Sequence, residues 1–210
     1  MICNTDKIDL VGIICGGFEY SHTSSQEKFY FVYVSSIRKS GLEDVLPVLV
    51  SDKLVDINQD LTGMRVEVIG SIRTYNYSEN EKNHLQVYVF ADIFRETEKY
   101  DYNRVTLTGT ICKKPYYRQT PKERQITDIL LAVNMPKGKS YYIPLITWSR
   151  NAVFVSGMQP GDKLSIHGRL QSRIYHKVTD DGQIEMVAYE VSAYKICLEE
   201  EIEGNDHEKA

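Results

Sequence analysis

The apolar and polar residues of this chain alternate over many short runs, a spacing typical of β-strands rather than of helices. We expect ten strands in two sets of five, and each set has one connector that is a short helix or irregular. Glycine residues interrupt several strands, and an interior glycine usually marks a bulge or a sharp bend. The predicted strands cover residues 8–19, 28–36, 45–51, 64–75 and 84–94, then 104–114, 125–134, 140–148, 162–175 and 183–197, with connectors at 53–62 and 150–158.

The two sets of strands are copies of one sequence pattern. The sequence LVGIIC at residues 10–15 reappears as LTGTIC at residues 107–112, which is 97 positions later. Further along, Tyr77 corresponds to Tyr175 at an offset of 98, which indicates one inserted residue in the second connector. A repeat determines the number of domains better than chain length does, and here it predicts two.

Five short, strongly bent strands with a connector between the third and fourth are typical of the OB-fold. This fold is a partly open Greek-key barrel that binds oligonucleotides or oligosaccharides. We therefore predict an all-β protein with two tandem five-stranded OB-fold barrels. The domains are expected at residues 1–101 and 102–198, followed by an acidic, disordered tail at residues 199–210.

The net charge of −4 conceals an uneven distribution of charged residues. Residues 1–101 hold 10 Lys and Arg against 16 Asp and Glu, a net charge of −6, whereas residues 102–198 hold 14 against 7, a net charge of +7. The tail holds 1 against 6. A basic segment between acidic ones indicates that the second copy binds a polyanion.

The stretch from Tyr141 to Tyr175 combines aromatic rings with arginines and contains the only Trp of the chain. In a strand over residues 140–148, alternation places Tyr142, Pro144, Ile146 and Trp148 on one face, and Ile143 and Leu145 on the other. Because Trp148 lies opposite the apolar face, we expect its ring at the surface. Flat rings among guanidinium groups are what single-stranded nucleic acid requires of a binding surface.

The second copy resembles the bacterial single-stranded DNA-binding protein family over Tyr102 to Leu198. Several ordered motifs carry this resemblance at the spacing of the family. They are NRVTLTG at residues 103–109, Pro115, YRQT at 117–120, LAVN at 131–134, YIPLITWS at 142–149 and GDKLSIHGRLQSRIY at 161–175.

The resemblance implies a binding surface for single-stranded DNA that is indifferent to base sequence. Aromatic rings would stack on bases, arginines and a lysine would contact phosphates, and the protein would protect DNA during replication, recombination or repair. The implied base contacts are Tyr142, Trp148, Phe154 and Tyr175, and the implied phosphate contacts are Arg104, Arg118, Arg150, Arg169, Arg173 and Lys177.

The first copy departs from the family pattern. It has Val45 in the place of Tyr142 and Ser51 in the place of Trp148, and only Tyr77 keeps the ring found at Tyr175. Its aromatic residues gather instead at residues 29–33, FYFVY, where both strand faces are apolar or aromatic. We expect burial of both faces there, against the other barrel or a partner subunit.

The sequence leaves two other classes of protein open. An OB-fold nuclease would need a cluster of carboxylates for a metal ion, but the second copy holds only seven acidic residues, and Asp180 and Asp181 are better explained as a turn. A primosomal type of interaction scaffold with weak DNA binding is the other alternative. Family members often end in an acidic tip that finishes in Pro-Phe and recruits replication and repair proteins, and the tail EEEIEGNDHEKA has no such end.

The remaining expectations concern partners and chemistry. Family members commonly assemble four OB-folds, so a tandem chain predicts a homodimer; sedimentation as a monomer at micromolar concentration would contradict it. Replication or recombination proteins are possible partners. The cysteines Cys3, Cys15, Cys112 and Cys197 form no CxxC pair, so we expect reduced, mostly buried thiols, no metal site, no cofactor and no enzymatic activity. No window is apolar enough for a membrane span, which predicts a cytoplasmic, nucleoid-associated protein.

Overall fold

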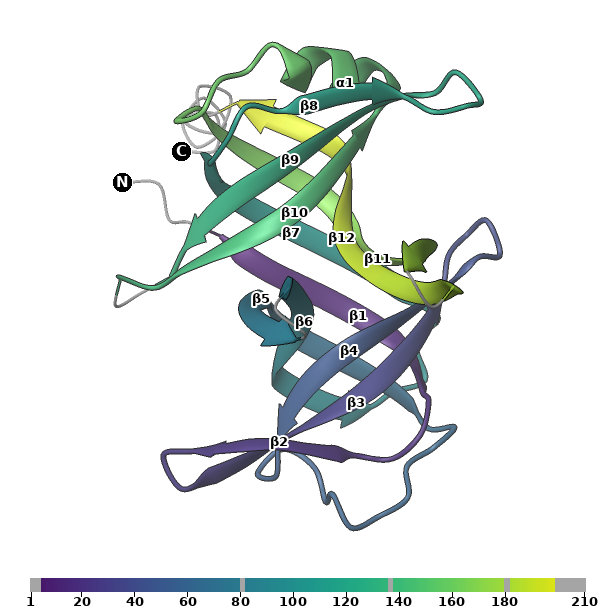
Figure 1. Cartoon of the computed structure of the whole chain (residues 1–210). Coiled ribbons are helices and arrows are strands. Elements are labelled where there is room, and N and C mark those ends of the chain that lie inside the picture. The colour runs from purple at the N-terminus through teal and green to yellow at the C-terminus, as the bar shows by residue number, and fades with distance from the viewer. Residues whose placement is uncertain (1–4, 80–81, 136–137, 180–181, 199–210) are drawn as a thin grey trace, which may run out of the picture. The chain divides into compact units, whose positions relative to one another are not determined.

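The computed structural model describes residues 5–79, 82–135, 138–179 and 182–198, which form two compact β-sheet units with one α-helix (Figure 1). The N-terminal unit consists of Ile8–Asn103 and Leu170–Glu190, and the C-terminal unit contains Arg104–Arg169 together with the described residues 5–7 and 191–198. The N-terminal unit thus runs past the expected boundary at residue 101 to Asn103 and also includes residues 170–190. The tail at 199–210 lies outside the described residues.

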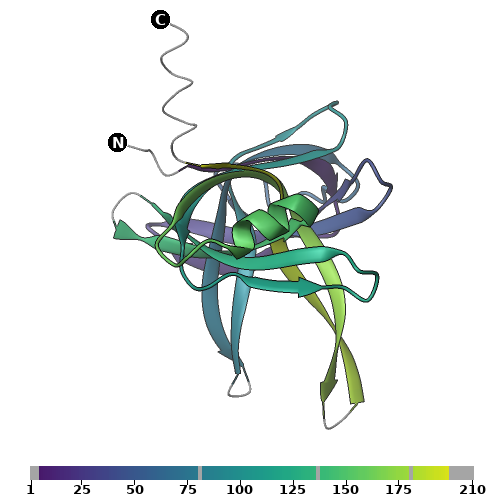
Figure 2. The same cartoon turned by 90° about the horizontal axis from the view of Figure 1, so that it is seen from above.

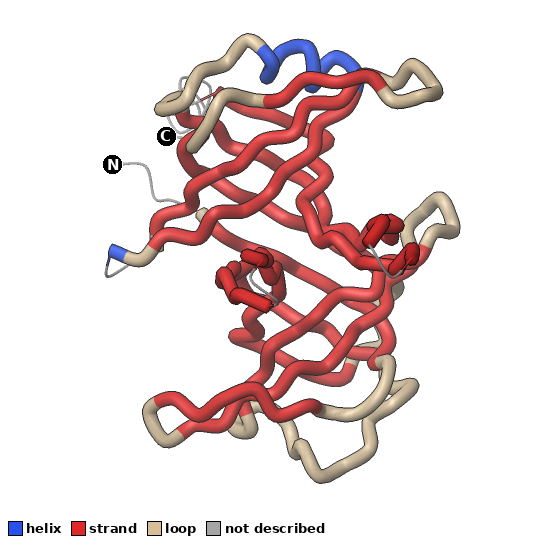
Figure 3. The backbone as a smooth tube through the Cα atoms, in the orientation of Figure 1, coloured by secondary structure: helices blue, strands red, loops and turns tan. Residues whose placement is uncertain are grey.

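The N-terminal unit is a barrel built from six strands. In sequence order they are β1 (Asp6–Ile14), β2 (Glu19–Ser24), β3 (Glu27–Ile37), β4 (Glu43–Ser51), β5 (Arg65–Glu79) and β6 (Lys82–Glu96). Their spatial order is β2-β3-β4-β6-β5-β1, and a further pairing of β1 with β3 closes the sheet. Figure 3 shows that strands make up most of the described backbone.

The C-terminal unit repeats this arrangement. The elements of this second copy are β7 (Tyr102–Ile111), β8 (Tyr116–Gln119), β9 (Gln125–Asn134), β10 (Ser140–Trp148), the helix α1 (Ser149–Ser156), β11 (Lys163–Thr179) and β12 (Gly182–Leu198). The outer parts of β11 and β12, within residues 170–190, are those that group with the N-terminal unit. The spatial order β8-β9-β10-β12-β11-β7, with closure between β7 and β9, matches the N-terminal order strand for strand. The predicted all-β architecture of two related barrels is therefore confirmed.

Each barrel has one strand more than the five predicted. The additional strands β2 and β8 pair with β3 and β9, respectively. In each of these two strands every residue but one is exposed. They therefore lack the alternation of buried and exposed positions that is typical of the other strands. The sequence prediction missed both strands, apart from Glu19 at the end of the predicted strand 8–19, because neither has an apolar periodicity.

Closure of each barrel depends on a glycine at the bend of its first strand. A Cβ atom at Gly12 would lie 2.1 Å from the carbonyl oxygen of Ser35, and one at Gly109 would lie 2.4 Å from that of Ala132. Both distances are far below van der Waals contact. These two glycines therefore allow the strands to cross closely where β1 meets β3 and β7 meets β9.

The core of the C-terminal unit follows from strand alternation. Ile129 and Leu131 of β9 and Ile143 and Leu145 of β10 point inward and are at most 5% exposed. Each buried aliphatic side chain of this size contributes about 1.5 to 3 kcal/mol of hydrophobic stabilisation. The interior therefore fixes the orientation of the residues that alternate with them on the outside.

The helix α1 has two turns and lies in the connector at 150–158, which the sequence predicted as a short helix or irregular. It buries Ala152 and Val155 and packs against β9 and β10, as Figures 1 and 2 show. The hydroxyl of Thr127 donates a hydrogen bond to the carbonyl oxygen of Ala152 at 2.8 Å. Tertiary packing thus stabilises a helix with weak intrinsic propensity. In the N-terminal unit, residues 53–62 are irregular.

The described cysteines are free thiols, but they are not buried as predicted. Cys15 is exposed, and Cys112 and Cys197 are partly exposed. Cys3 lies outside the described residues. Among the residues that the structure describes, no helix has the length and apolar character to cross a membrane.

Candidate nucleic-acid interface

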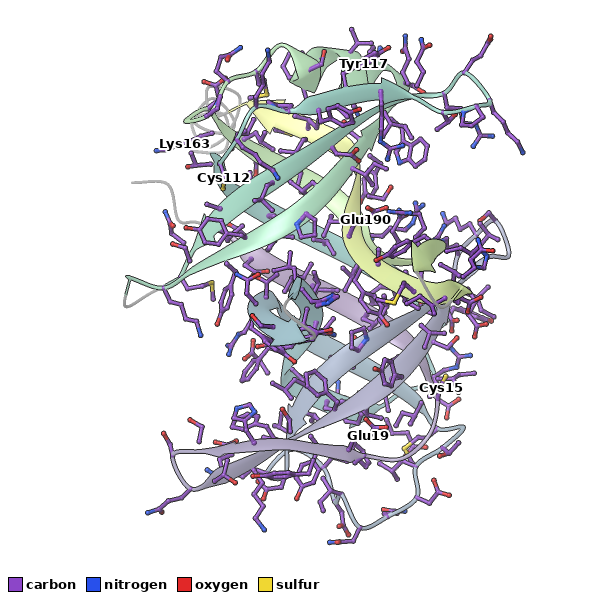
Figure 4. All side chains as sticks on the ribbon, viewed as in Figure 1. Cys15, Glu19, Cys112, Tyr117, Lys163 and Glu190 are labelled. Atoms are coloured by element: carbon purple, nitrogen blue, oxygen red, sulfur yellow. The ribbon has the colours of Figure 1, made fainter. Side chains whose placement is uncertain are left out.

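Three adjacent strands of the C-terminal unit, β8, β9 and β10, share one outward face. Residues directly opposite each other on neighbouring strands point to the same side of a sheet. The register therefore places the following cross-strand sets on this face: Tyr142 with Ala132, Pro144 with Leu130, Ile146 with Asp128 and Tyr116, and Trp148 with Ile126 and Arg118. We call this surface the outer face. Tyr117, labelled in Figure 4, alternates with Tyr116 and Arg118 and belongs to the other side of β8.

The two rings predicted on the outer face of β10 are both accessible. Tyr142 is 48% exposed, and Trp148 is half-buried at the end of the strand. The indole Nε1 of Trp148 donates a hydrogen bond to the hydroxyl of Ser192 on β12 at 3.2 Å. This bond holds the indole in one orientation, so its open side is ready to stack without a further loss of side-chain entropy.

Further aromatic rings lie in the same unit. Phe154 on α1, which the resemblance implies as a base contact, is 48% exposed. The sequence analysis did not select Tyr116 or Tyr194, which are 65% and 58% exposed. Asn151 of α1 donates a hydrogen bond to the carbonyl oxygen of Tyr194 at 3.0 Å, which connects the helix to β12. The exposed position of Tyr116 was concealed because β8 itself was not predicted.

The predicted phosphate contacts of this unit differ in their surroundings. Arg104 on β7 and Arg150 on α1 are exposed, and Arg169 on β11 is partly exposed. Arg118 instead forms a two-point ion pair with Asp128, with distances of 2.7 Å from Nε to Oδ2 and 3.2 Å from Nη2 to Oδ1. Asp128 therefore neutralises Arg118 on the outer face.

Tyr175, Arg173 and Lys177, which the sequence also assigned to DNA binding, belong to the part of β11 that groups with the N-terminal unit. Tyr175 is 37% exposed, and the guanidinium carbon of Arg173 lies 5.7 Å from its ring centre. The Nε atom of Arg173 also lies 3.4 Å from the carboxylate of Glu190 on β12, labelled in Figure 4. The side chain of Lys177 lies outside the described residues.

In the described part of the chain, no three His, Cys, Asp or Glu side chains gather closely enough to hold a metal ion. Two acidic residues of the C-terminal unit have other partners. Asp128 binds Arg118, and Asp162 accepts a hydrogen bond from the backbone of Gln159 at 2.7 Å.

The rings, their supporting contacts and the barrel that carries them lie in the part of the chain that matches the family model described as "Single-strand binding protein family", at residues 102–197. Residues 102–197 are a domain of the single-strand binding protein family. The match leaves residues 1–101 outside, so it extends to the second copy of the repeat alone.

Curated relatives agree with this assignment of the single-strand binding domain. The chain is 34% identical over 80 residues to Single-stranded DNA-binding protein A of Bacillus subtilis, which covers 35% of this chain and 46% of that protein. It is 34% identical over 89 residues to Single-stranded DNA-binding protein 2 of Streptococcus agalactiae serotype V, covering 39% and 66%. The matches thus span about half to two thirds of these relatives.

Solved structures share the fold of almost the whole chain, beyond the single-strand binding domain. The wild-type single-stranded DNA binding protein from Thermus aquaticus superimposes with a TM-score of 0.75 at 17% identity, covering 94% of each chain. A deletion mutant of the same protein gives a TM-score of 0.72 at 20% identity and covers 94% of this chain and 96% of that one. At this identity the likeness concerns the fold, which includes the N-terminal unit.

The ion pair on the outer face leads to a prediction for the single-strand binding domain. Replacing Asp128 with Asn removes a negative charge from the outer face and frees Arg118 to meet a phosphate. We expect tighter binding of oligo-dT and a plot of log K against log salt that is steeper by about 0.7, the contribution of one neutralised phosphate. Fluorescence anisotropy at several salt concentrations measures both.

A matched control is Asp162→Asn, which removes the same charge from the turn before β11. It should change the affinity far less. Equal gains in the two variants would mean that only the net charge matters, and that Arg118 contacts no phosphate.

Proposed function

We propose that this chain binds single-stranded DNA without regard to base sequence, chiefly through the outer face of its C-terminal unit. The observation that carries the proposal is the pair of accessible rings on one strand, Tyr142 and Trp148, within a single-strand binding domain. Every base has a π-face, so rings that stack on bases bind any sequence.

The charge of the second copy supports the same proposal. Residues 102–198 carry a net charge of +7, and Arg104 and Arg150 place exposed guanidinium groups on β7 and α1. Guanidinium groups bind phosphate oxygens through paired donors and remain charged at any physiological pH. Stacking supplies affinity that is insensitive to salt, and the arginines add a component that salt weakens.

The wider biological role is part of the proposal. A sequence-independent binder protects exposed strands during replication, recombination or repair, in the cytoplasm and on the nucleoid. Members of the family commonly assemble four OB-folds. Two chains of two barrels each reach this number through one symmetric interface, so the chain acts as a homodimer. Tyr175, Arg173 and Lys177 are proposed as additional DNA contacts from the N-terminal unit.

The direct test is a titration of the protein with oligo-dT at two salt concentrations, read by the fluorescence of Trp148. We expect strong quenching, since the only Trp of the chain lies on the proposed surface. The apparent affinity should fall at the higher salt by about 0.7 logarithmic units per neutralised phosphate for each tenfold increase in salt. Duplex DNA of the same length serves as the control.

An absence of quenching and of anisotropy change at micromolar concentrations would contradict the proposal and favour the scaffold alternative. Cleavage of labelled single-stranded DNA in the presence of Mg²⁺ or Ca²⁺ would instead favour the nuclease.

A further inference from the structure

The N-terminal unit has no accessible ring at the position that corresponds to Trp148. Ser51 occupies this position, is only 3% exposed, and donates a hydrogen bond from its hydroxyl to Glu27. Any part that the N-terminal unit has in DNA binding must therefore depend on other residues.

Rings of β3 and β6, the strands on both sides of β4, contact each other in this unit. Phe29 lies 5.8 Å from Phe90, and Phe31 lies 5.6 Å from Tyr88, measured between ring centres. The prediction that residues 29–33 pack against another barrel or subunit is therefore corrected in part, because two of these rings pack against β6 of the same unit.

The N-terminal unit also includes residues that are proposed above as DNA contacts. The outer parts of β11 and β12, residues 170–179 and 182–190, extend as two neighbouring strands, which we call the ribbon (Figure 2). Arg173 and Tyr175 lie on it. Glu190 connects its two strands, since it accepts a hydrogen bond from Nε2 of Gln171 at 2.9 Å and lies 3.4 Å from Nε of Arg173.

Side chains replace a neighbouring strand at one edge of the ribbon. β7 pairs with β11 only from Lys163 to Gly168. Two residues further along, the side-chain nitrogen of Asn103 donates to the carbonyl oxygen of Leu170 at 2.6 Å, and its side-chain oxygen accepts from the backbone nitrogen of Leu170 at 3.0 Å. Backbone polar groups require hydrogen-bond partners, and here a side chain supplies them.

Asp44 makes the next contact along this edge. Alternate residues of a strand direct their backbone groups to the same side, so Ser172 follows Leu170 on this edge. Its backbone nitrogen donates to Oδ1 of Asp44 at 2.9 Å, and its hydroxyl accepts a hydrogen bond from the backbone nitrogen of Val45 at 3.2 Å. Two hydrogen bonds in opposite directions therefore connect the ribbon to β4, directly before Arg173.

The carboxylate of Asp44 is held in one orientation. It is only 1% exposed, and Arg38 donates to both of its oxygens, from Nε to Oδ2 at 2.6 Å and from Nη2 to Oδ1 at 2.5 Å. Two parallel bonds from a planar guanidinium fix the geometry of a carboxylate. The oxygen that Ser172 contacts is therefore fixed as well. We call Arg38, Asp44 and Ser172 the clasp.

The ion pair of the clasp has no counterpart in the second copy. At the repeat offset of 97, Asp44 corresponds to Tyr141 and Arg38 corresponds to Met135, and the second barrel forms without this pair. A buried ion pair adds little net stability compared with apolar residues of similar size. Stability therefore does not account for a charged pair at this position, whereas holding the ribbon in one arrangement does.

We propose that Asp44 is a positioning residue for DNA binding: with Arg38 it fixes the backbone of β11 at Ser172, and thereby keeps Arg173 and Tyr175 in place for a bound strand. The inference rests on the single-stranded DNA binding proposed above. It gives the N-terminal unit a part in that binding that requires no ring at Ser51. A side chain that is already in place loses less conformational entropy on binding than a mobile one.

The test is a double-mutant cycle between Asp44→Ala and the ribbon variant Arg173→Ala/Tyr175→Ala. Anisotropy of a labelled oligo-dT of about 40 nucleotides, longer than two OB-folds cover, measures the affinity. The ribbon variant should bind about fivefold more weakly or less tightly still, because it loses a stacked base. Asp44→Ala should bind about threefold to tenfold more weakly, although both contacts are present.

The third corner of the cycle distinguishes positioning from an independent effect. Because Asp44 acts through the ribbon, adding Asp44→Ala to the ribbon variant should lower the affinity no further. Quenching of Trp148 at saturation should remain at the wild-type level in every variant, since the outer face is unchanged. Amide hydrogen exchange at Ser172 should be faster in Asp44→Ala than in the wild type without DNA.

Glu67→Gln is the matched control for a general loss of stability. Glu67 is a carboxylate of the same unit that is 3% exposed, and its partners Arg95, Lys99 and Tyr102 lie outside the ribbon. This variant should bind oligo-dT like the wild type.

Ser172→Ala tests the clasp without a change of charge. It removes the hydroxyl that accepts a hydrogen bond from Val45, and it should lower the affinity about twofold. If thermal melting shows that Asp44→Ala is unfolded, Ser172→Ala takes its place in the cycle and decides the outcome.

The outcomes separate this inference from the proposed function. If the wild type binds no oligo-dT at all, both fail. If the wild type binds but the folded clasp variant keeps its full affinity, or if the clasp and ribbon losses add, Asp44 does not position the ribbon, and binding through the outer face stands. A ribbon variant with wild-type affinity, or an equal loss in Glu67→Gln, would also overturn the inference alone.

Discussion

Replacing Trp148 and Tyr142 together with alanine is expected to lower the affinity for oligo-dT by at least about 30-fold. Each stacked base contributes about 1 to 3 kcal/mol, so two rings contribute about 2 to 6 kcal/mol. Both rings lie on the outer face, so the loss of affinity comes from a change of the surface and not from a change of the core. Because the variant has no Trp, anisotropy of a labelled oligonucleotide measures the affinity.

Variants that keep a ring provide the matched control. Trp148→Phe/Tyr142→Phe should retain most of the affinity, although a phenyl ring in place of the indole cannot donate the hydrogen bond that Trp148 makes to Ser192. The slope of affinity against salt should be the same in the wild type and in both variants, because no charged group changes. Full affinity in the double alanine variant would place the bases elsewhere.

The largest effect on folding is expected at Glu67 on β5. This carboxylate is 3% exposed and binds three side chains. They are Arg95 at the end of β6, Lys99 in the segment that follows, and Tyr102 at the start of β7. Arg95 donates to it at 2.8 Å and 2.5 Å, and the hydroxyl of Tyr102 donates at 3.1 Å. Hydrogen bonds from Lys99 and Arg95 lower its pKa from 4.5 to about 2.

Glu67→Gln is expected to lower the free energy of unfolding at pH 7 by about 2 kcal/mol. A pKa that is lower in the folded state means that the ionised carboxylate stabilises the fold. Arg95 and Lys99 are more than half exposed, so water screens the attraction, and the loss stays below the full value of a buried ion pair.

The sign of the shift sets the pH dependence of this effect. The stabilisation is fully present above about pH 4.5, the ordinary pKa of the carboxyl group, and is lost as the pH falls toward 2. The difference between wild type and variant should therefore shrink from pH 5 downward. Urea unfolding at pH 7, 4 and 3 measures it, with the exposed Glu19→Gln as a control (Glu19 is labelled in Figure 4). If wild type and Glu67→Gln differ in free energy of unfolding by the same amount at all three pH values, the substitution acts through the shape of the side chain and not through its charge.

The sequence predicted the barrels because their determinants are local and repeated. Gly12 and Gly109 lie 97 positions apart in equivalent strands, and both permit the crossing that closes a barrel. The orientation of Tyr142 and Trp148 followed from alternation alone, since Ile143 and Leu145 fill the core. Ile146 lies on the outer face but is only 2% exposed, and alternation alone does not predict this burial.

The features that the sequence missed depend on contacts between distant segments. The ion pair of Arg118 with Asp128 depends on the register between β8 and β9, and β8 has no periodicity that would reveal it. The ring contact between Phe31 and Tyr88 joins residues 57 positions apart in the sequence. The FYFVY stretch was conspicuous, but both faces of its strand are apolar or aromatic, so no pattern indicated which rings would remain open.

The burial of Ser51 has a consequence for how the two copies diverged. An indole introduced at this position would have to displace the hydrogen bond to Glu27 and enter a site that is closed to solvent, and such overpacking costs about 1 to 3 kcal/mol. The surface of the C-terminal unit therefore cannot be recreated in the N-terminal unit by a single substitution. The two copies of the repeat therefore share a scaffold, but the surface of the second cannot be transferred to the first by changing one residue.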